Sequence, residues 1–115
     1  MTALELAPED PALIDLRRLC PRTQRLEEGG HVYYLLPDLF LGDSVNPKQC
    51  DALLRVGGGD GYSSRLLLAA KVEGRQLNWN CEAFILQRRW FAFSWKAQDG
   101  LTGTRLLSAH LRAFR

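Results

Sequence analysis

The sequence has few of the residues that cross-link small domains or bind metals. Its three cysteines, Cys20, Cys50 and Cys81, are odd in number and widely spaced, which excludes a dense disulfide framework. The two histidines, His31 and His110, form no close pair with a cysteine or with each other, so no zinc motif is present. We therefore expect three reduced thiols, and neither a metal nor a cofactor.

Long apolar runs and a strong charge bias are also missing. No apolar segment reaches the roughly 18 residues that a membrane span needs, and residues 1–11 are acidic and unlike a signal peptide. The formal net charge of +2 is too small to indicate a nucleic acid or a membrane as partner. The hydrophobic content of 46% is typical of a globular protein. These features predict one cytoplasmic domain over residues 1–115.

A nucleotide-binding loop is absent as well. The glycine-rich run at 57–61, GGGDG, has neither the GxxxxGK[ST] nor the GxGxxG spacing, and no helix pattern follows it. Lys71 lies too far along the chain to serve such a loop. We interpret the run as a turn. His31 and His110 have no adjacent acid or cysteine, so we expect both at the surface or at a boundary of the core.

The periodicity of the chain predicts a helix at each end and strands between. Asp10 is a good N-cap, Pro11 suits the first helical position, and Pro21 ends the helix. Thr104 is the candidate N-cap of the last helix. The expected helices are residues 11–20 and 104–114. The expected strands are 31–36 with a kinked continuation at 39–41, 52–56 and 66–72, whereas 90–95 fits a strand or a buried loop.

This order predicts an α+β fold, in which an antiparallel β-meander of about four strands is flanked by N- and C-terminal helices. The expected core contains the large apolar residues of these elements: Leu13, Leu16, Leu53, Leu67, Phe84, Trp90, Leu107 and Leu111.

The stretch Gln76–Trp95 holds the candidate reactive group. Cys81 lies between two asparagines and a run of aromatic residues. A nucleophilic thiol needs partial exposure and nearby cations, which Arg75, Arg88 and Arg89 supply in sequence, although Glu82 acts in the opposite direction. Asn80 and Asn78 are neutral donors suited to an oxyanion at an acyl centre. Together these residues indicate acyl transfer through a thioester. The alternative is that Cys81 is a small buried thiol.

The aromatic residues of the same stretch allow a second interpretation. Trp79 and Trp90, with Arg88 and Arg89 between them, have the composition of a surface on which nucleic-acid bases stack. The alternative, which the small net charge favours, is that the rings fill the core and the arginines extend to solvent.

The whole arrangement resembles ubiquitin-conjugating (E2) enzymes, and is most similar to the prokaryotic E2-like proteins of bacterial ubiquitin-like conjugation operons. A GYP-like turn follows the third strand in that family, and Gly61-Tyr62-Ser63 follows the predicted strand 52–56 here. The cysteine precedes a tryptophan, as Cys81 precedes Trp90. The WFAFS sequence at 90–94 is similar to the family's segment before the last helix. The resemblance covers residues 10–114.

The resemblance implies an E2-type fold and a carrier function. An E1-like activating enzyme would load a ubiquitin-like modifier onto Cys81, and a lysine of a protein target would accept the modifier, with Asn80 or Asn78 holding the oxyanion. Bacterial antiphage defence is the implied setting. The family's His-Pro-Asn motif is absent. A non-catalytic E2-like interaction subunit and a small nucleic-acid-binding module therefore stay open as alternatives.

Overall fold

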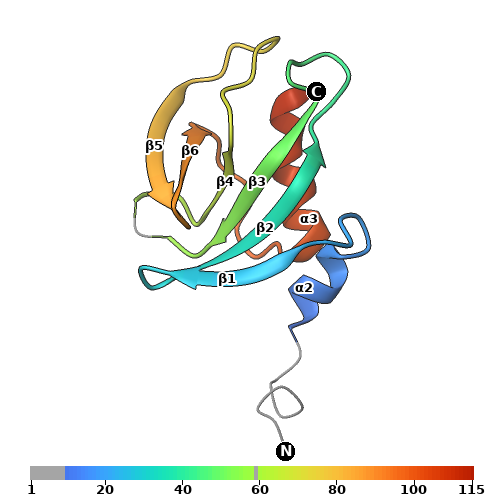
Figure 1. The fold of residues 1–115 in the computed structure, drawn as a ribbon, viewed down its shortest axis with the longest axis vertical. Coiled ribbons are helices and arrows are strands. Elements are labelled where there is room, and N and C mark those ends of the chain that lie inside the picture. Colours follow the sequence, from blue (N-terminus) through green and yellow to red (C-terminus); the bar gives the residue numbers. More distant parts are fainter. Residues whose placement is uncertain (1–9, 59) are drawn as a thin grey trace, which may run out of the picture.

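The structure, a computed structural model, describes residues 10–58 and 60–115, and six antiparallel strands form its single sheet (Figure 1). The strand order is β1-β2-β3-β4-β6-β5, so β1 and β5 are the edges. The strands are β1 (Gln24–Glu28), β2 (His31–Phe40), β3 (Gln49–Val56), β4 (Ser64–Leu68), β5 (Trp79–Ile85) and β6 (Arg88–Phe93). The helices are α2 (Pro11–Leu16), α3 (Gly103–Leu111) and the short 3-10 helix η1 (Arg112–Phe114).

The predicted α+β, E2-like fold is wrong, because the domain is mostly β. Strand makes up 41% of the structure and helix 17%. Two causes account for the difference. Two strands that were not predicted, β1 and β5, join the sheet, and β5 pairs with β6 in a hairpin, so that the sheet has six strands instead of about four. The helices are also short, with six residues in α2 and nine in α3.

The two helices contact each other through a side chain of α2. Asp10 caps α2 as predicted, accepting hydrogen bonds from the backbone N–H groups of Ala12 and Leu13. The predicted cap of the last helix is wrong, because the N-cap is Thr102. Thr104 lies in the first turn, where its N–H and its hydroxyl both donate to the carboxylate of Asp15. These bonds satisfy an orphan donor of α3 and fix α2 beside it.

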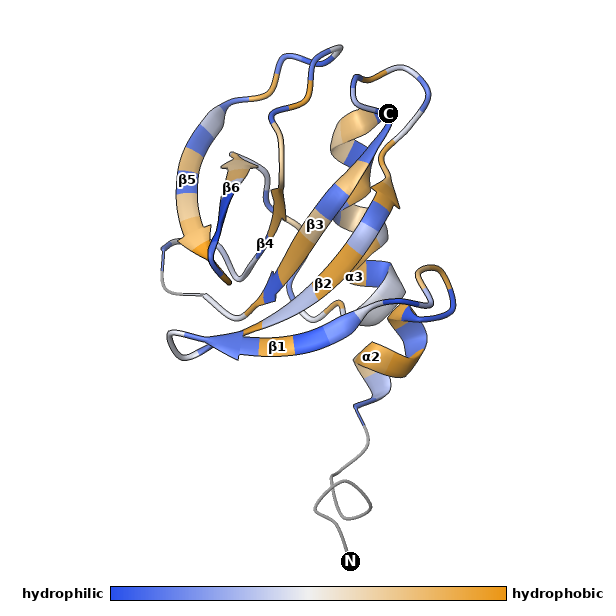
Figure 2. Cartoon of the chain, in the orientation of Figure 1, coloured by the Kyte–Doolittle hydropathy of each residue, from blue (hydrophilic) through white to orange (hydrophobic). Residues whose placement is uncertain are grey.

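Apolar clusters cover both faces of the sheet. Along β3 the side chains alternate, so that Ala52 and Leu54 belong to the cluster under α3, and Leu53 belongs to a second cluster. The β5–β6 hairpin curls over this second face, and Figure 2 shows the apolar residues of the central strands between the hairpin and α3. Trp90, with no exposed surface, lies in the second cluster.

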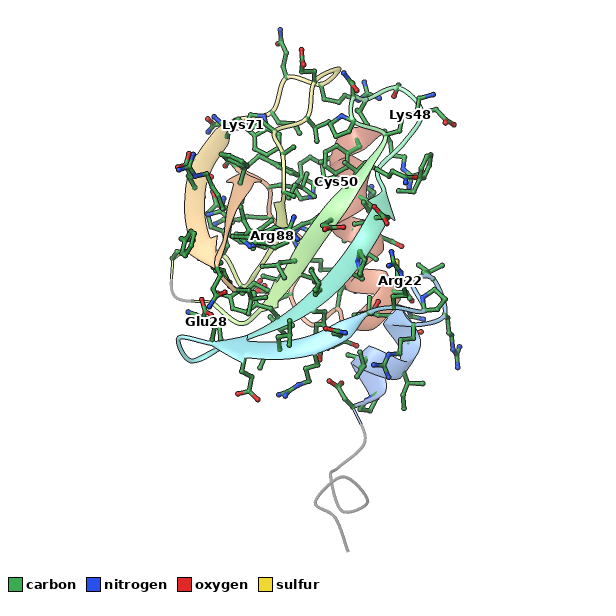
Figure 3. All side chains as sticks on the ribbon, in the orientation of Figure 1. Arg22, Glu28, Lys48, Cys50, Lys71 and Arg88 are labelled. Atoms are coloured by element: carbon green, nitrogen blue, oxygen red, sulfur yellow. The ribbon has the colours of Figure 1, made fainter. Side chains whose placement is uncertain are left out.

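Polar contacts at the turn of the hairpin hold it over the sheet. The backbone N–H of Leu86 donates to the carboxylate of Glu28 at the β1–β2 turn, at 3.1 and 3.3 Å. Arg88 forms an ion pair of 2.9 Å with Asp51 of β3. Figure 3 labels Glu28 and Arg88, each of which takes part in one of these two contacts. These contacts hold the hairpin against β1 and β3, two strands with which it forms no backbone pairing.

Most of the predicted core is buried, with one clear error. Phe84 is 74% exposed, because it points outward from the edge strand β5. Leu13 is partly buried against the α3-side cluster. The other six predicted core residues are buried: Leu16, Leu53, Leu67, Trp90, Leu107 and Leu111.

Candidate functional site

Cys81 lies on the edge strand β5, opposite Ala92 of β6. A β-bulge precedes it, between Trp79 and Cys81. The cysteine is partly exposed, and its side chain packs against the second apolar cluster. Its position at the edge leaves one side of its backbone without a neighbouring strand in the described sheet. Cys81 is therefore half covered by the core and half accessible from the rim of the sheet.

The predicted cationic surroundings of Cys81 do not form from β6. Arg88 pairs with Ile85 and Arg89 with Phe84 in the strand register. These positions lie three or four residues from Cys81, about 10–13 Å along the strand. Arg89 instead lies 3.4 Å from the carboxylate of Glu82. The two guanidinium groups thus have other partners and do not contact the thiol.

Burial disfavours the thiolate form of the other two cysteines. Desolvation raises the pKa of Cys50, and burial also raises the pKa of Cys20. Because the thiolate is the reactive form, burial acts against nucleophilic reactivity at both side chains.

Asn80 is the bulged residue next to Cys81, and its amide is held from both ends. Its Nδ2 donates to the hydroxyl of Tyr62 at 3.0 Å, and its Oδ1 accepts a short hydrogen bond from Nη2 of Arg65. Tyr62 lies in the loop between β3 and β4, and Arg65 lies on β4. The structure therefore brings together three residues that are separated by up to 18 positions.

Tyr62 is the centre of this polar cluster. Its hydroxyl also lies 3.0 Å from Oγ of Ser94, and the guanidinium carbon of Arg65 lies 4.1 Å from its ring centroid. The hydrogen bonds with Ser94 and Asn80 lower the pKa of the Tyr62 hydroxyl, and the charges of Arg65 and Lys96 act in the same direction. These contacts thus favour the phenolate form of Tyr62 relative to that of an isolated tyrosine.

Asp60 connects the cluster to two buried arginines, Arg55 and Arg65. Its carboxylate accepts hydrogen bonds from Arg55 at 2.9 and 3.0 Å and from Arg65 at 3.3 Å. The bonds with Arg55, followed by that with Arg65, hold the pKa of Asp60 far below its usual range. Both arginines are buried, and Arg65 also donates to the carbonyl of Phe93 at 3.1 Å. Arg65 therefore links Asp60 of the glycine-rich loop to β6, and Arg55 links the same carboxylate to β3.

The sequence-based argument missed Tyr62, Arg65, Ser94 and Asp60 as parts of this site. One signal was present in the sequence. Arg55 and Arg65 each interrupt an apolar strand, and a buried guanidinium requires a carboxylate or carbonyl partner. Asp60 is the acid between them.

Asn78 does not belong to the cluster. Its side chain is exposed, and its backbone carbonyl accepts from the N–H of Ser94 at 2.7 Å. Asn78 thus supports the start of the hairpin through its backbone, whereas Asn80, which precedes Cys81 in the chain, is the asparagine whose side-chain amide is held by hydrogen bonds.

The aromatic residues mostly fill the core. Trp79, Phe93 and Phe114 form two edge-to-face contacts with centroid distances of 5.2 and 5.5 Å. Trp90 and Phe93 are buried. Base stacking needs exposed rings, so Trp90 and Phe93 are not available for it, whereas Trp79 is partly exposed. The glycine-rich run leads into β4 rather than into a helix, which agrees with its interpretation as a turn.

His110 is buried, so its expected place at the surface or boundary is wrong. Its Nε2 lies 2.9 Å from Oγ of Ser64, and burial, with a smaller effect from Arg65, lowers its pKa to about 4. Ser64 is buried too. The pair is closed to a substrate and acts as a polar contact inside the fold.

The depressed pKa of His110 predicts a loss of stability in mild acid. The unfolded chain takes up the proton near pH 6.5 and the folded one only near pH 4, so the stabilisation is complete above pH 6.5 and falls between these values. We expect the free energy of unfolding to fall by about 2–3 kcal/mol from this group. Urea unfolding at a series of pH values measures it. His110→Gln should flatten the curve in this range, and an unchanged pH dependence in that variant would contradict the assignment.

Among residues 10–58 and 60–115, no group of three or more His, Cys, Asp or Glu side chains is arranged to hold a metal ion. None of the helices in the same part of the chain has the length and apolar character to cross a membrane. Comparisons with protein-family models, with curated proteins and with solved structures give no match to this chain.

Proposed function

We propose that this chain is an acyl carrier that holds the C-terminal carboxyl group of a ubiquitin-like modifier as a thioester on Cys81. The observation that carries the proposal is the pairing of an accessible thiol with an oriented amide. Cys81 lies at the open edge of the sheet, and the preceding Asn80 is fixed by Tyr62 and Arg65. The proposal rests on this site and on the sequence resemblance, and not on an E2 fold.

The chemistry that we propose is two successive acyl transfers. The modifier is first held as a thioester on the E1-like enzyme. The thiolate of Cys81 attacks the carbonyl carbon, so that the new thioester forms, the thioester bond to the E1-like enzyme breaks and the thiolate of that enzyme leaves. A neutral lysine amine of a protein target then attacks the Cys81 thioester; the amide bond forms, the Cys81 thiolate leaves, and the proton of the amine passes to this thiolate or to solvent. Asn80 donates one of its two N–H groups to Tyr62, and within the described residues the other has no partner. This N–H is the candidate donor to the oxyanion in each step. Antiphage defence is proposed from the resemblance alone.

A gel assay without reductant tests the carrier function. The protein is incubated with an E1-like enzyme, ATP and a ubiquitin-like modifier, taken from a bacterial conjugation operon. We expect an adduct that thiol treatment removes, and that forms in Cys20→Ser and Cys50→Ser but not in Cys81→Ala. Cys81→Ser should form an ester that resists thiols, because an oxygen ester exchanges poorly with them.

Two further outcomes would reassign the function. An adduct that persists in Cys81→Ala would place the thioester on another residue. If no variant forms an adduct, the protein is not a carrier.

Asn80→Asp is a matched variant, because it retains the size of the side chain but removes the N–H donors. It should still form the adduct, but both the loading of Cys81 and the transfer of the modifier to an amine should be slower than in the wild type.

A non-catalytic interaction subunit is the second candidate. It is favoured by the exposed Phe84 on the unpaired edge of β5, and by the packing of the Cys81 side chain against the core. In this case the edge strand would add to a strand of the partner. Retained partner binding in Cys81→Ala, together with loss of binding in Phe84→Asp, would support this function over the carrier.

A further inference from the structure

One face of the C-terminal helix carries a groove that neither proposed function uses. The groove has a volume of about 590 Å³ and is open to solvent along α3 and η1. Leu106, Leu107 and Leu111 point the opposite way, into the core under the sheet. The residues that line the groove follow the helical spacing of i, i+3, i+4 and i+7, so that they share one face of the helix.

The groove is basic. Arg105, Arg112 and Arg115 line it, and all three side chains are exposed. No acidic residue occurs between Leu101 and Arg115. The carboxylate of Asp15 accepts hydrogen bonds from Thr104, which lower its pKa, and the charges of Arg18 and Arg105 act in the same direction. None of the three arginines has an ion-pair partner among the described residues.

Apolar and hydroxyl groups lie between the charges. Leu101 and Ala109 line the groove and are partly buried, and Ser108 contributes an exposed hydroxyl. A site that binds by charge alone would not need these apolar residues. Arginine forms bidentate hydrogen bonds with the carboxylates of a ligand, and the apolar residues beside the arginines offer contact area to apolar side chains of the same ligand.

We propose that this groove binds an acidic, leucine-containing segment of a partner protein. Arg105 and Arg112 are seven residues apart, which corresponds to about 10 Å along a helix. A peptide in the polyproline II conformation rises about 3.1 Å per residue with three residues per turn, so carboxylates three positions apart lie on one face and about 9 Å apart, close to this separation. The residues between the two carboxylates then lie beside Ala109, which lines the groove between Arg105 and Arg112. The small net charge of the whole chain and the single short row of arginines favour a peptide over a nucleic acid.

Fluorescence anisotropy with a labelled synthetic peptide tests the groove. The peptide has glutamate at every third position with leucine and alanine between, and a control peptide has glutamine at those positions. We expect saturable binding of the glutamate peptide that weakens with added salt, and at least about tenfold weaker binding of the glutamine peptide.

Charge-reversal variants locate the binding. Arg105→Glu with Arg112→Glu should weaken binding at least about tenfold, and the milder pair Arg105→Gln with Arg112→Gln should weaken it less. Lys71→Glu with Arg75→Glu has the same charge change on the segment between β4 and β5, and should bind as the wild type does. Circular dichroism confirms that each variant is folded.

Three results would overturn the proposal. They are the absence of saturable binding of the glutamate peptide, an equal loss of binding in the Lys71 and Arg75 control, and tighter binding of a single-stranded oligonucleotide of equal charge. The last would assign the groove to nucleic acid.

Discussion

Trp90→Ala is expected to lower the free energy of unfolding by about 3–5 kcal/mol, a large part of the total stability of a small domain. Trp90 has no exposed surface and lies in the cluster between the β5–β6 hairpin and the central strands. Its indole N–H donates to the carbonyl of Ile85 at 2.9 Å, and the guanidinium carbon of Arg88 lies 4.7 Å from its ring centroid. The substitution leaves a cavity and removes one hydrogen bond to the carbonyl of Ile85.

Urea unfolding followed by circular dichroism measures this loss. Phe84→Ala is the matched control, because it also truncates an aromatic side chain of the hairpin, but one that is largely exposed. It should change the stability by less than about 1 kcal/mol. Trp90→Phe should fall between the two, since it retains most of the apolar volume without the donor. Equal losses in Trp90→Ala and Phe84→Ala would mean that the hairpin does not pack on the sheet as described.

Asp60→Ala is expected to destabilise the protein by about 3 kcal/mol, because it leaves two buried guanidinium groups without their carboxylate. Arg55 and Arg65 are 8% and 5% exposed, whereas the Asp60 side chain is 39% exposed, so solvent reduces the effect. Loss of this anchor should also free the loop that holds Tyr62 against Asn80. The variant should therefore lose orientation of the amide as well as stability.

The pH dependence gives the same prediction an independent test. The folded-state pKa of Asp60 is depressed, so its stabilisation is complete above the unfolded-state value near pH 4 and is lost as the pH falls below it. The stability difference between wild type and Asp60→Asn should be constant from about pH 7 to pH 5 and should shrink below about pH 4.

A surface ion pair supplies the comparison. Glu27 pairs with Arg25 at 2.8 Å, and its side chain is 64% exposed. Glu27→Ala should change the free energy of unfolding by no more than about 1 kcal/mol. If Asp60→Ala is equally mild, the two buried arginines do not depend on this carboxylate.

The local elements were predictable where one strong signal was decisive. Asp10 before Pro11 marks the start of α2, and the structure confirms the cap. Pro37-Asp38 marks the kink within β2, where the register shifts and Asp38 adopts a φ of 52°. Such features depend on the few backbone conformations that a residue and its neighbours allow. They therefore need no information about the rest of the fold.

The β5–β6 hairpin lacked such a signal. Its turn is Leu86-Gln87, and both residues have positive φ, 53° and 63°. Two-residue hairpin turns of this kind usually contain glycine or asparagine, so the sequence does not mark the turn. The alternation along β5 is also ambiguous, because the outward residue Phe84 is as apolar as those facing the core. Only pairing with β6 and packing over the sheet make this segment a strand.

The sequence by itself determined that Cys81 and Asn80 are neighbours, that the thiols are too sparse for a disulfide framework, and where the β2 kink and the first cap lie. The tertiary structure decided that the domain is mostly β and that Arg88 and Arg89 turn away from Cys81. It also decided that Tyr62 and Arg65 hold the amide of Asn80. The physical reason is that these contacts join separate strands, and the order and curvature of the strands depend on how both faces of the sheet are buried.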